Sequence, residues 1–556
     1  MQVLQKINKK FNMKKQQIIS GKIVDIVSQK IFEGTIIIEK GKIISVKEEK
    51  NNNEKYIIPG LIDSHIHVES SMLIPSEFAR LAVTHGTVAT VSDPHEIANV
   101  LGIKGIKYMI ENGKKVPFKF YFGASSCVPA TPFETSGAAL GITETEELLK
   151  MDEIKYLSEM MNFPGVLFDD EEVLKKIALA KKYKKPVDGH APGVKGKDAE
   201  KYILAGISTD HECFTLEEAL DKVKHGMFIQ IREGSAAKNF NALISLMEKY
   251  SDKVMFCSDD RHPNDLEKGH INELVKRAIK CGYNPIKVLR TCTYNPVKHY
   301  KLDVGLLQEG DNADFVIIDN LDDFNVLETY INGEKVAEKG KSLIKSVNED
   351  TPNNFNASQI SIDDLIVYPD KKKIKVIEAL EGQLVTSKII CVPKIFENNI
   401  VSDVENDILK LVVLNRYENS KPAIGFIKNF GFKNGAIAST VAHDSHNIVA
   451  VGVSDKDIVK AINLLVKEKG GVSVVNENDS MVLPLAVAGI MSNNDAYKVA
   501  ADYEKIDKKA KQLGSKLNAP YMTLSFMALL VIPEIKLSDK GLFDGTKFEF
   551  ASLFEN

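Results

Sequence analysis

Two histidines separated by one residue, His65 and His67, lie near the end of an apolar stretch of the chain, residues 60–69 (GLIDSHIHVE). In an extended strand, residues i and i+2 project from the same face, so both imidazoles can reach one metal ion. Imidazole is a ligand for several transition metals, including zinc and iron. The preceding residues, 57–62, form the apolar run that is typical of a buried parallel strand. Such a pair is informative only when further ligands follow at comparable positions.

Similar short strands recur after this one. Between residue 60 and about residue 300 they alternate with helical stretches, which predicts repeated βα units and a parallel sheet. Eight such units in about 240 residues predict a (β/α)8 TIM-like barrel, in which the carboxyl ends of the strands build the active site. An open, doubly wound sheet would instead gather its polar residues at one switch point. The eight expected strands are residues 60–69, 87–96, 119–127, 154–160, 185–190, 206–212, 227–233 and 254–260.

Potential metal ligands stand at the ends of several of these strands. Four histidines with two or three carboxylates suffice for two metal ions that share a bridging carboxylate and a bridging hydroxide. Such a metal makes hydroxide available near neutral pH, because it lowers the pKa of its bound water to about 7. The ligands are His65 and His67 from the first strand, Glu159 from the fourth, His190 from the fifth, His211 from the sixth, and Asp259 or Asp260 from the eighth.

The barrel is flanked by other segments. Residues 17–58 alternate apolar and polar positions around glycines, which predicts a small β meander. A second β stretch begins at residue 304, and we expect its strands to rejoin the meander in one sheet. We therefore divide this α/β protein into residues 1–58 and 304–345, which form the small β domain, 59–303, the barrel, and 361–556, a C-terminal α/β domain. Residues 346–360 have the composition of a linker.

Composition excludes several classes of partner. The chain has 556 residues and a net charge of −4, and its Lys and Arg residues are spread along it, so no nucleic-acid-binding surface is expected. Its six cysteines form no C-x-x-C pair, which is typical of a reducing compartment. No signal peptide and no apolar run of membrane-spanning length are present. These features predict a cytoplasmic protein without a membrane or nucleic-acid partner. Symmetry base rates favour a homodimer.

Eight motifs together resemble those of the amidohydrolase superfamily and, within it, the adenine deaminase family. The resemblance extends from about residue 17 to the end of the chain. It implies a metal-dependent hydrolase barrel with a binuclear centre of Mn or Fe, with Zn as another candidate. It also implies hydrolysis of adenine, a small-molecule purine, to hypoxanthine and ammonia in purine salvage. The motifs are residues 67–72 (HVESSM), 93–100 (DPHEIANV), 125–129 (SSCVP), 159–162 (EMMN), 188–190 (DGH), 231–235 (IREGS), 259–261 (DDR) and 441–447 (VAHDSHN).

The resemblance also implies roles for single residues. Glu159 replaces the carbamylated lysine that bridges the metals in many relatives, and superfamily usage assigns metal ligation to Asp259 and leaves Asp260 as proton shuttle. Attack on C6 of a purine requires protonation of a ring nitrogen and of the leaving amino group. A positioned acid or base accelerates each of these proton transfers by about 10²–10⁴-fold. The H-x-E…P-C-x-x-C route to nucleobase deamination is excluded, because no C-x-x-C exists here. Further candidates are Asp93, His95 and Glu96 for catalysis, Arg232, Glu233 and Glu69 for substrate binding, and His443 and His446 for a lid or an extra ligand.

Ordinary structural roles remain open for several of these residues. Glu159 could lie on a helix face, and Asp93 before a proline could simply form a turn. Arg232 and Glu233 could pair with each other. His443 and His446 could belong to an ordinary turn in a loop. Two other functions also remain open: hydrolysis of another cyclic amidine or amide, and a non-catalytic scaffold of the same fold. Packing or surface positions are expected for His85, His225, His262, His270 and His299.

Overall fold

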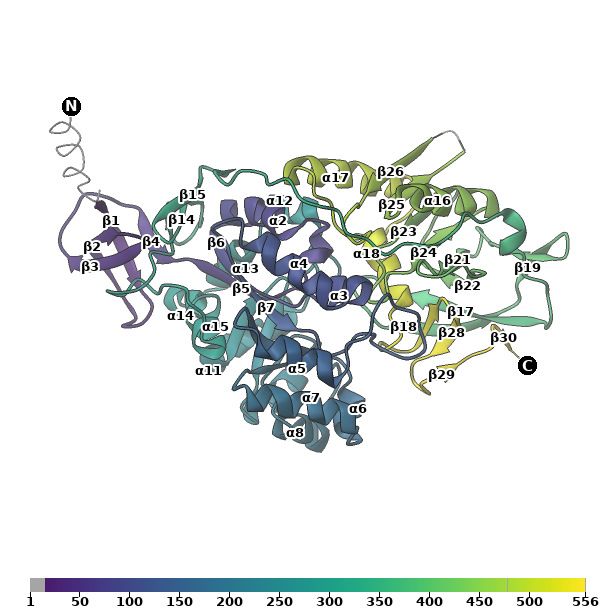
Figure 1. Cartoon of the computed structure of the whole chain (residues 1–556), viewed down its shortest axis with the longest axis horizontal. Coiled ribbons are helices and arrows are strands. Elements are labelled where there is room, and N and C mark those ends of the chain that lie inside the picture. Colours follow the sequence, from purple (N-terminus) through teal and green to yellow (C-terminus); the bar gives the residue numbers. More distant parts are fainter. Residues whose placement is uncertain (1–15, 478, 556) are drawn as a thin grey trace, which may run out of the picture.

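The computed structural model describes residues 16–477 and 479–555 and arranges them as a small β sheet, a barrel and a C-terminal domain in a row (Figure 1). The small sheet takes strands from both sides of the barrel, in the order β16-β15-β14-β13-β4-β1-β2-β3. Strand β4 joins the two halves, because it pairs in parallel with β1 and antiparallel with β13. The strands are β1 (Gln17–Asp25), β2 (Lys30–Glu39), β3 (Lys42–Glu48), β4 (Tyr56–Pro59), β13 (Phe315–Ile318), β14 (Val326–Ile331), β15 (Glu334–Glu338) and β16 (Lys341–Ser342).

Eight parallel strands form the barrel, one in each segment where a strand was expected. Two ladders, β5 to β9 and β10 to β12, are closed into a ring by bridges between Val187 and Ile207 and between Ile66 and Asp259. The second bridge includes a hydrogen bond of 3.0 Å from Asp259 N to His65 O. The strands are β5 (Leu61–Ile66), β6 (Thr87–Ser92), β7 (Lys119–Ala124), β8 (Ile154–Met160), β9 (Val187–Gly189), β10 (Thr209–Asp210), β11 (Phe228–Arg232) and β12 (Val254–Cys257).

Helices follow the barrel strands and bury one apolar face each. In α13, Ile271, Leu274, Val275 and Ala278 are buried at the spacing of one helix face. Caps define several starts: Thr215, for example, accepts from Glu218 N at the start of α9, a contact worth about 1 kcal/mol. The helices are α2 (Pro75–Ala82), α3 (His95–Leu101), α4 (Ile103–Gly113), α5 (Ile142–Lys150), α6 (Phe163–Leu167), α7 (Glu171–Lys182), α8 (Gly196–Leu204), α9 (Leu216–Lys224), α10 (Phe240–Leu243), α11 (Met247–Tyr250), α12 (Pro263–Lys268), α13 (Ile271–Lys280), α14 (Pro285–Thr291) and α15 (Tyr294–Tyr300).

The C-terminal domain is built on a nine-stranded sheet with helices packed against it. Strands β21 and β24 lie inside this sheet and are buried along their whole length. The sheet strands are β17 (Lys373–Ala379), β18 (Thr386–Cys391), β21 (Ile408–Leu414), β22 (Ala423–Lys428), β23 (Ala436–Ser439), β24 (Ile448–Gly452), β25 (Gly471–Val475), β26 (Ser480–Pro484) and β30 (Phe554–Glu555). The other elements are β19 (Lys394–Phe396), β20 (Asn399–Val401), β27 (Ile535–Ser538), β28 (Gly541–Asp544), β29 (Glu549–Phe550), α16 (Asp455–Glu468), α17 (Ala496–Gln512) and α18 (Pro520–Ser525).

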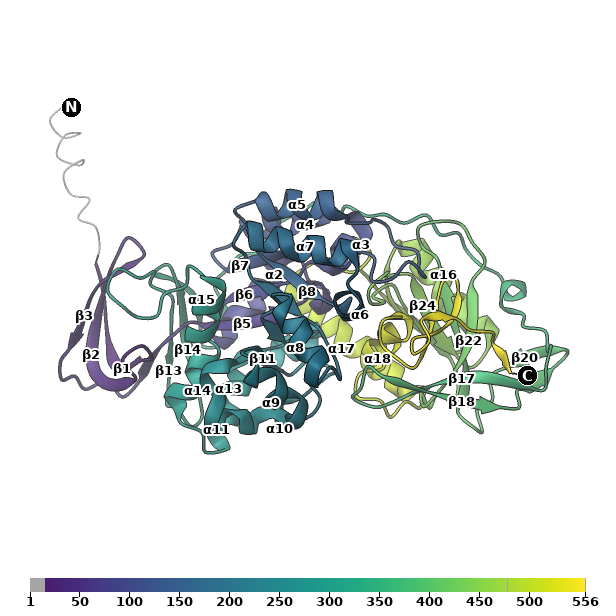
Figure 2. The ribbon, with the colours of Figure 1, turned by 90° about the horizontal axis from the view of Figure 1, so that it is seen from below.

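Barrel and C-terminal domain share one hydrophobic core, which runs from barrel residues such as Ile66 to Met527 after α18. Ser492 adds backbone hydrogen bonds between the two parts, because its N–H donates to Met72 O and its carbonyl accepts from Ile74 N. Helix α18 lies between the barrel and the C-terminal sheet in both views (Figures 1 and 2). The C-terminal domain is therefore packed directly against the barrel.

The predicted fold class is confirmed: an α/β protein with a (β/α)8 barrel, a flanking β sheet made by both ends of the barrel segment, and a C-terminal α/β domain. The domain boundaries stay predictions. Strand β4 ends at Pro59 and α15 at Tyr300, and residues 346–360 contain neither helix nor strand. Residues 1–15 lie outside the described part of the chain. None of the helices in the described part is long and apolar enough to cross a bilayer.

Candidate active site

The six predicted metal ligands come together at the carboxyl ends of the barrel strands, and all are buried. Glu159 lies at their centre and presents its two oxygens to different partners. Oε1 is 3.4 Å from His67 Nε2. Oε2 is 2.8 Å from His190 Nδ1 and 3.2 Å from His211 Nε2. A carboxylate that bridges two metal ions would have this arrangement, with each oxygen facing different ligands. The ligands are His65, His67, Glu159, His190, His211 and Asp259.

Asp259 completes the side of the site that includes the His-x-His pair. Its Oδ1 lies 3.4 Å from His67 Nε2 and 3.6 Å from His65 Nε2. Donor atoms bound about 2.1 Å from one ion lie roughly 3–3.5 Å apart. Both ring nitrogens of buried His65 lack a hydrogen-bond partner among the described residues, whereas His67 Nδ1 lies 3.2 Å from Asp93 O. That carbonyl can fix the His67 tautomer that leaves Nε2 free for a metal. The residues therefore fit a divalent metal ion.

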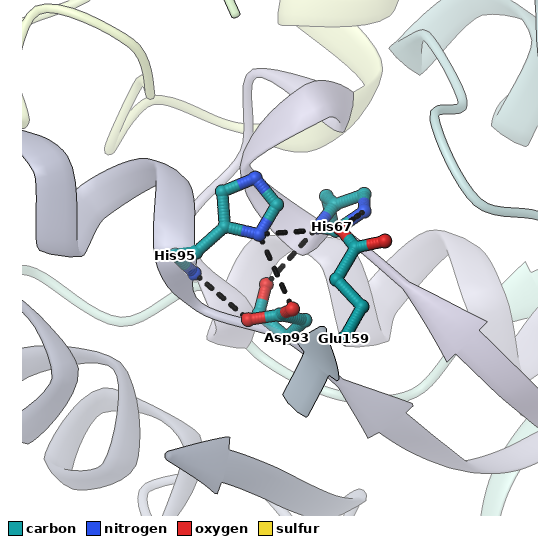
Figure 3. Close-up of side chains that lie close together, drawn as sticks. All are labelled: His67, Asp93, His95 and Glu159. Atoms are coloured by element: carbon teal, nitrogen blue, oxygen red, sulfur yellow. Dashed lines mark hydrogen bonds and ion pairs between the residues drawn. The ribbon is translucent and has the colours of Figure 1, made fainter. Parts of the chain in front are cut away.

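Asp93 and His95, two of the predicted catalytic residues, border this centre from the second strand end (Figure 3). His95 begins α3, and its Nδ1 lies 3.2 Å from Asp93 Oδ2 and 3.4 Å from Glu159 Oε1. Its Nε2 lies 3.3 Å from Glu96 Oε1. Ligand atoms of His67, Asp93, His95 and Glu159 lie within 4.8 Å of one another. His95 is thus placed between the metal ligands and Glu96.

The two consecutive aspartates after β12 face different groups. Asp259 has a φ of 57°, in the left-handed region that few non-glycine residues adopt. Asp259 faces the paired histidines, whereas Asp260 accepts a hydrogen bond from Ser70 Oγ. Burial and the neighbouring Asp259 raise the pKa of Asp260 above its ordinary value. This contrast favours Asp259 as ligand and Asp260 as proton carrier.

The three predicted substrate-binding residues lie in different places. Arg232 lines the pocket, but its guanidinium is paired with Glu212 and Asp259. Glu233 pairs with Arg277, at 2.6 Å, and not with Arg232. These contacts favour supporting roles for both residues, and their predicted contacts with a substrate stay predictions.

Glu69 lies next to Glu96 instead of in the pocket wall. It is buried and accepts a hydrogen bond of 3.2 Å from Ile97 N in α3. Burial raises the pKa of Glu69 to about 7. Its predicted substrate contact also stays a prediction.

His443 and His446 reach this site from the loop between β23 and β24. Both are buried, and both contact Glu96: His443 Nδ1 at Oε1, and His446 Nε2 at Oε2, 2.5 Å away. His443 Nε2 lies 3.8 Å from Asp260 Oδ1. Residues 443–445 form a turn, but this turn is buried against the barrel, and its predicted role as a lid or a source of an extra ligand stays a prediction.

Several residues around the pocket escaped the sequence analysis. Glu212 lies 3.5 Å from His211 Nε2, and its position directly after His211 at a strand end was a signal. Asp444 lies 3.7 Å from His95 Nε2. The apolar wall of the pocket had no sequence signal, since most of it comes from the C-terminal domain. This wall consists of Met161, Leu384, Phe526 and Leu529.

Comparisons with known proteins agree with this architecture. Residues 56–336 match the model of the amidohydrolase family, and residues 383–549 match that of the adenine deaminase C-terminal domain. Barrel and strand-end ligands thus define a hydrolase of the amidohydrolase class. Adenine deaminase of Methanosarcina mazei is 54% identical over 547 residues, covering 96% of this chain and 99% of the relative. The chain belongs to the adenine deaminase family.

Other relatives extend the match across distant organisms. Adenine deaminase of Sulfurovum sp. is 56% identical over 528 residues, covering 95% of this chain and 98% of the relative. That of Borreliella burgdorferi is 49% identical over 540 residues, covering 96% and 98%. Among solved structures, β-aspartyl dipeptidase of Fervidobacterium islandicum has a TM-score of 0.44 at 15% identity, covering 61% of this chain and 100% of that one. That last likeness is too slight to inform the site.

Proposed function

We propose that this protein hydrolyses adenine to hypoxanthine and ammonia at a centre of two divalent metal ions, Mn or Fe in preference to Zn. The observation that carries this proposal is the position of Glu159 between two groups of histidine nitrogens, at 3.4 Å on one side and 2.8 and 3.2 Å on the other. The name shared by relatives at about half identity over nearly the whole chain supports adenine as the substrate.

The two ions would be held by His65, His67 and Asp259 on one side and by His190 and His211 on the other, with Glu159 between them. When bound, they supply an activated water near neutral pH. The residues around them must then move protons, because C6 gains an oxygen while the adjacent ring nitrogen and the leaving amino group each gain a proton. Asp260 is suited to this transfer, since burial and the neighbouring Asp259 raise its pKa and so favour its protonated form.

Asp93, His95 and Glu96 would support this chemistry from the second strand end. Asp93 Oδ2 lies 3.2 Å from His95 Nδ1, which faces Glu159 Oε1 at 3.4 Å. The Glu96 carboxylate lies beyond His95 and contacts both loop histidines. Together these groups form a connected path of proton-binding side chains beside the metal ligands.

A flat heteroaromatic ring would lie against the apolar side of this pocket. Met161 comes from the barrel, and Leu384, Phe526 and Leu529 come from the C-terminal domain. Apolar side chains beside a few polar groups are typical of small-molecule pockets. Phe526 also stacks on His443, with ring centroids 4.7 Å apart. This wall would hold the purine plane and exclude bulk water.

We further propose a cytoplasmic enzyme of purine salvage that works as a homodimer.

The test is ammonia release by protein expressed in manganese-rich or iron-rich medium, with metal content measured in the same samples. Adenine, other purines, dihydropyrimidines and hydantoins form the substrate panel. We expect release from adenine, loss of metal and activity in His65→Ala, and no change in His225→Ala, whose side chain is exposed. Turnover of hydantoins or dihydropyrimidines without adenine would support another cyclic amide hydrolase. Protein without metal after such expression would support a scaffold.

A further inference from the structure

His443 has one ring nitrogen that no other residue uses. Its side chain is only 2% exposed, and Nδ1 contacts Glu96 Oε1. Nε2 has no hydrogen-bond partner among the described residues, and Asp260 Oδ1 lies 3.8 Å away. The residue lines the same pocket as the metal ligands. Buried polar atoms normally have a partner, so Nε2 indicates a contact with a ligand in this pocket.

The surroundings of His443 make this nitrogen a donor. Burial alone would lower the pKa of the imidazole, but the adjacent Glu96 carboxylate outweighs it and raises the pKa of His443 to about 9. At neutral pH both ring nitrogens then carry a proton. One points to Glu96, and the other points into the pocket. The ring is also held flat against Phe526, with an angle of 13° between the two planes.

His446 has a different role from His443, and its hydrogen bond with the backbone of Ala442 defines that role. The backbone N–H of Ala442 donates to His446 Nδ1 over 3.2 Å, so this nitrogen carries a lone pair. A neutral imidazole then has its proton on Nε2, which faces Glu96 Oε2. Burial lowers the pKa of His446, which keeps the ring neutral. Its protonated Nε2 therefore faces the Glu96 carboxylate and is unsuited to bind a metal ion.

We propose that His443 is a catalytic residue, supplied by the C-terminal domain, that donates a hydrogen bond from Nε2 to a lone-pair nitrogen of the purine ring. Glu96 and His446 are positioning residues, because they act through His443. The inference rests on the proposed function. Adenine offers three such acceptors, N1, N3 and N7. A hydrogen bond from a charged donor is worth roughly 10- to 100-fold in binding. The barrel alone would lack this contact.

Two substitutions separate the nitrogens of His443. His443→Asn retains an amide nitrogen near the position of Nδ1, so it keeps the contact with Glu96 and loses the group that faces the pocket. His443→Gln retains a nitrogen near the position of Nε2. We expect both variants to fold and to retain the metal content of the wild type. His443→Asn should lose binding, and His443→Gln should recover part of it.

Deaza analogues of adenine identify the contact. Dissociation constants for 1-deazaadenine, 3-deazaadenine and 7-deazaadenine are measured on metal-loaded wild type and both variants. We expect His443→Asn to weaken two analogues roughly 10- to 100-fold and to leave unchanged the one that lacks the contacted nitrogen. Equal effects on all three, or no effect on any, would overturn the role of His443 and leave adenine deamination in place. A metal-loaded wild type that binds none of them would overturn the proposed function as well.

Discussion

Arg232 donates to Asp259 from β11 and so holds the carboxylate whose other oxygen faces His65 and His67. Its second nitrogen donates to Glu212 over 2.9 Å. The three charges are buried together. Burial alone would raise the pKa of Asp259, but Arg232 and the histidines hold it well below its usual range. Arg232 therefore stabilises one side of the metal centre before any metal binds.

Arg232→Met should destabilise the metal-free protein by about 3–5 kcal/mol, because two buried carboxylates lose their counterion. Arg232→Lys should be intermediate, since an ammonium cannot donate to both carboxylates as a planar fork. Thermal melting of chelator-treated protein measures this. The control is Arg277→Met, which breaks a partly exposed pair with Glu233 and should cost under about 1 kcal/mol. Equal losses in both variants would contradict the role given to Arg232.

Asp63 is a second supporting carboxylate, and it joins the first and eighth strands. Its Oδ1 accepts from Ser258 N at 3.0 Å and from His65 N at 3.3 Å, and its Oδ2 lies 2.8 Å from His270 Nε2. Asp63→Asn turns one acceptor into a donor and should lower metal affinity about 10- to 100-fold while the fold persists. Metal retained against a graded chelator is the measurement. Asp314→Asn, directly before β13, should leave that affinity unchanged; a matching loss there would mean that the effect is a general one.

The convergence of the six predicted metal ligands could be predicted from the sequence because each stands at the end of a barrel strand, where the fold brings distant residues together. The partners of His443 could not be predicted from the sequence, since its contact with Glu96 depends on how the C-terminal domain packs on the barrel. Leu384 and Phe526 reach the pocket for the same reason. Arg232 and Glu233 were given one predicted role together, although neighbours on a strand point to opposite faces, and in the structure they pair with different groups.

His446→Ala should reduce adenine turnover without loss of metal, because the neutral ring presents its Nε2 proton to the Glu96 carboxylate and is unsuited to bind an ion. His446→Gln should restore part of the activity, since its amide can donate from nearly the same place. Elemental analysis beside ammonia release makes the distinction, with His211→Ala as the comparison that does lose metal. A lower metal content in His446→Ala would identify this histidine as an extra ligand instead.

Lys536 is a buried lysine that contacts the backbone of the apolar wall. It has no carboxylate partner among the described residues. Its ammonium donates to Leu384 O at 2.7 Å and Phe526 O at 3.0 Å, and both of those residues line the pocket. Burial lowers the pKa of Lys536 to about 7. An unfolded lysine has a pKa of about 10.4. Between these values the unfolded chain binds more protons than the folded one.

The contribution of Lys536 to the free energy of unfolding should therefore rise with pH between about 7 and 10, by at most about 1.4 kcal/mol per pH unit, and be constant below pH 7. Melting midpoints of wild type and Lys536→Met are compared across pH 6 to 9.5, so that other titrating groups cancel. The melting midpoint of the wild type should rise relative to that of Lys536→Met as the pH increases. Lys540→Met, at an exposed position of the same hairpin, should follow the wild type. Parallel curves for wild type and Lys536→Met would show that this lysine stays charged in the folded protein.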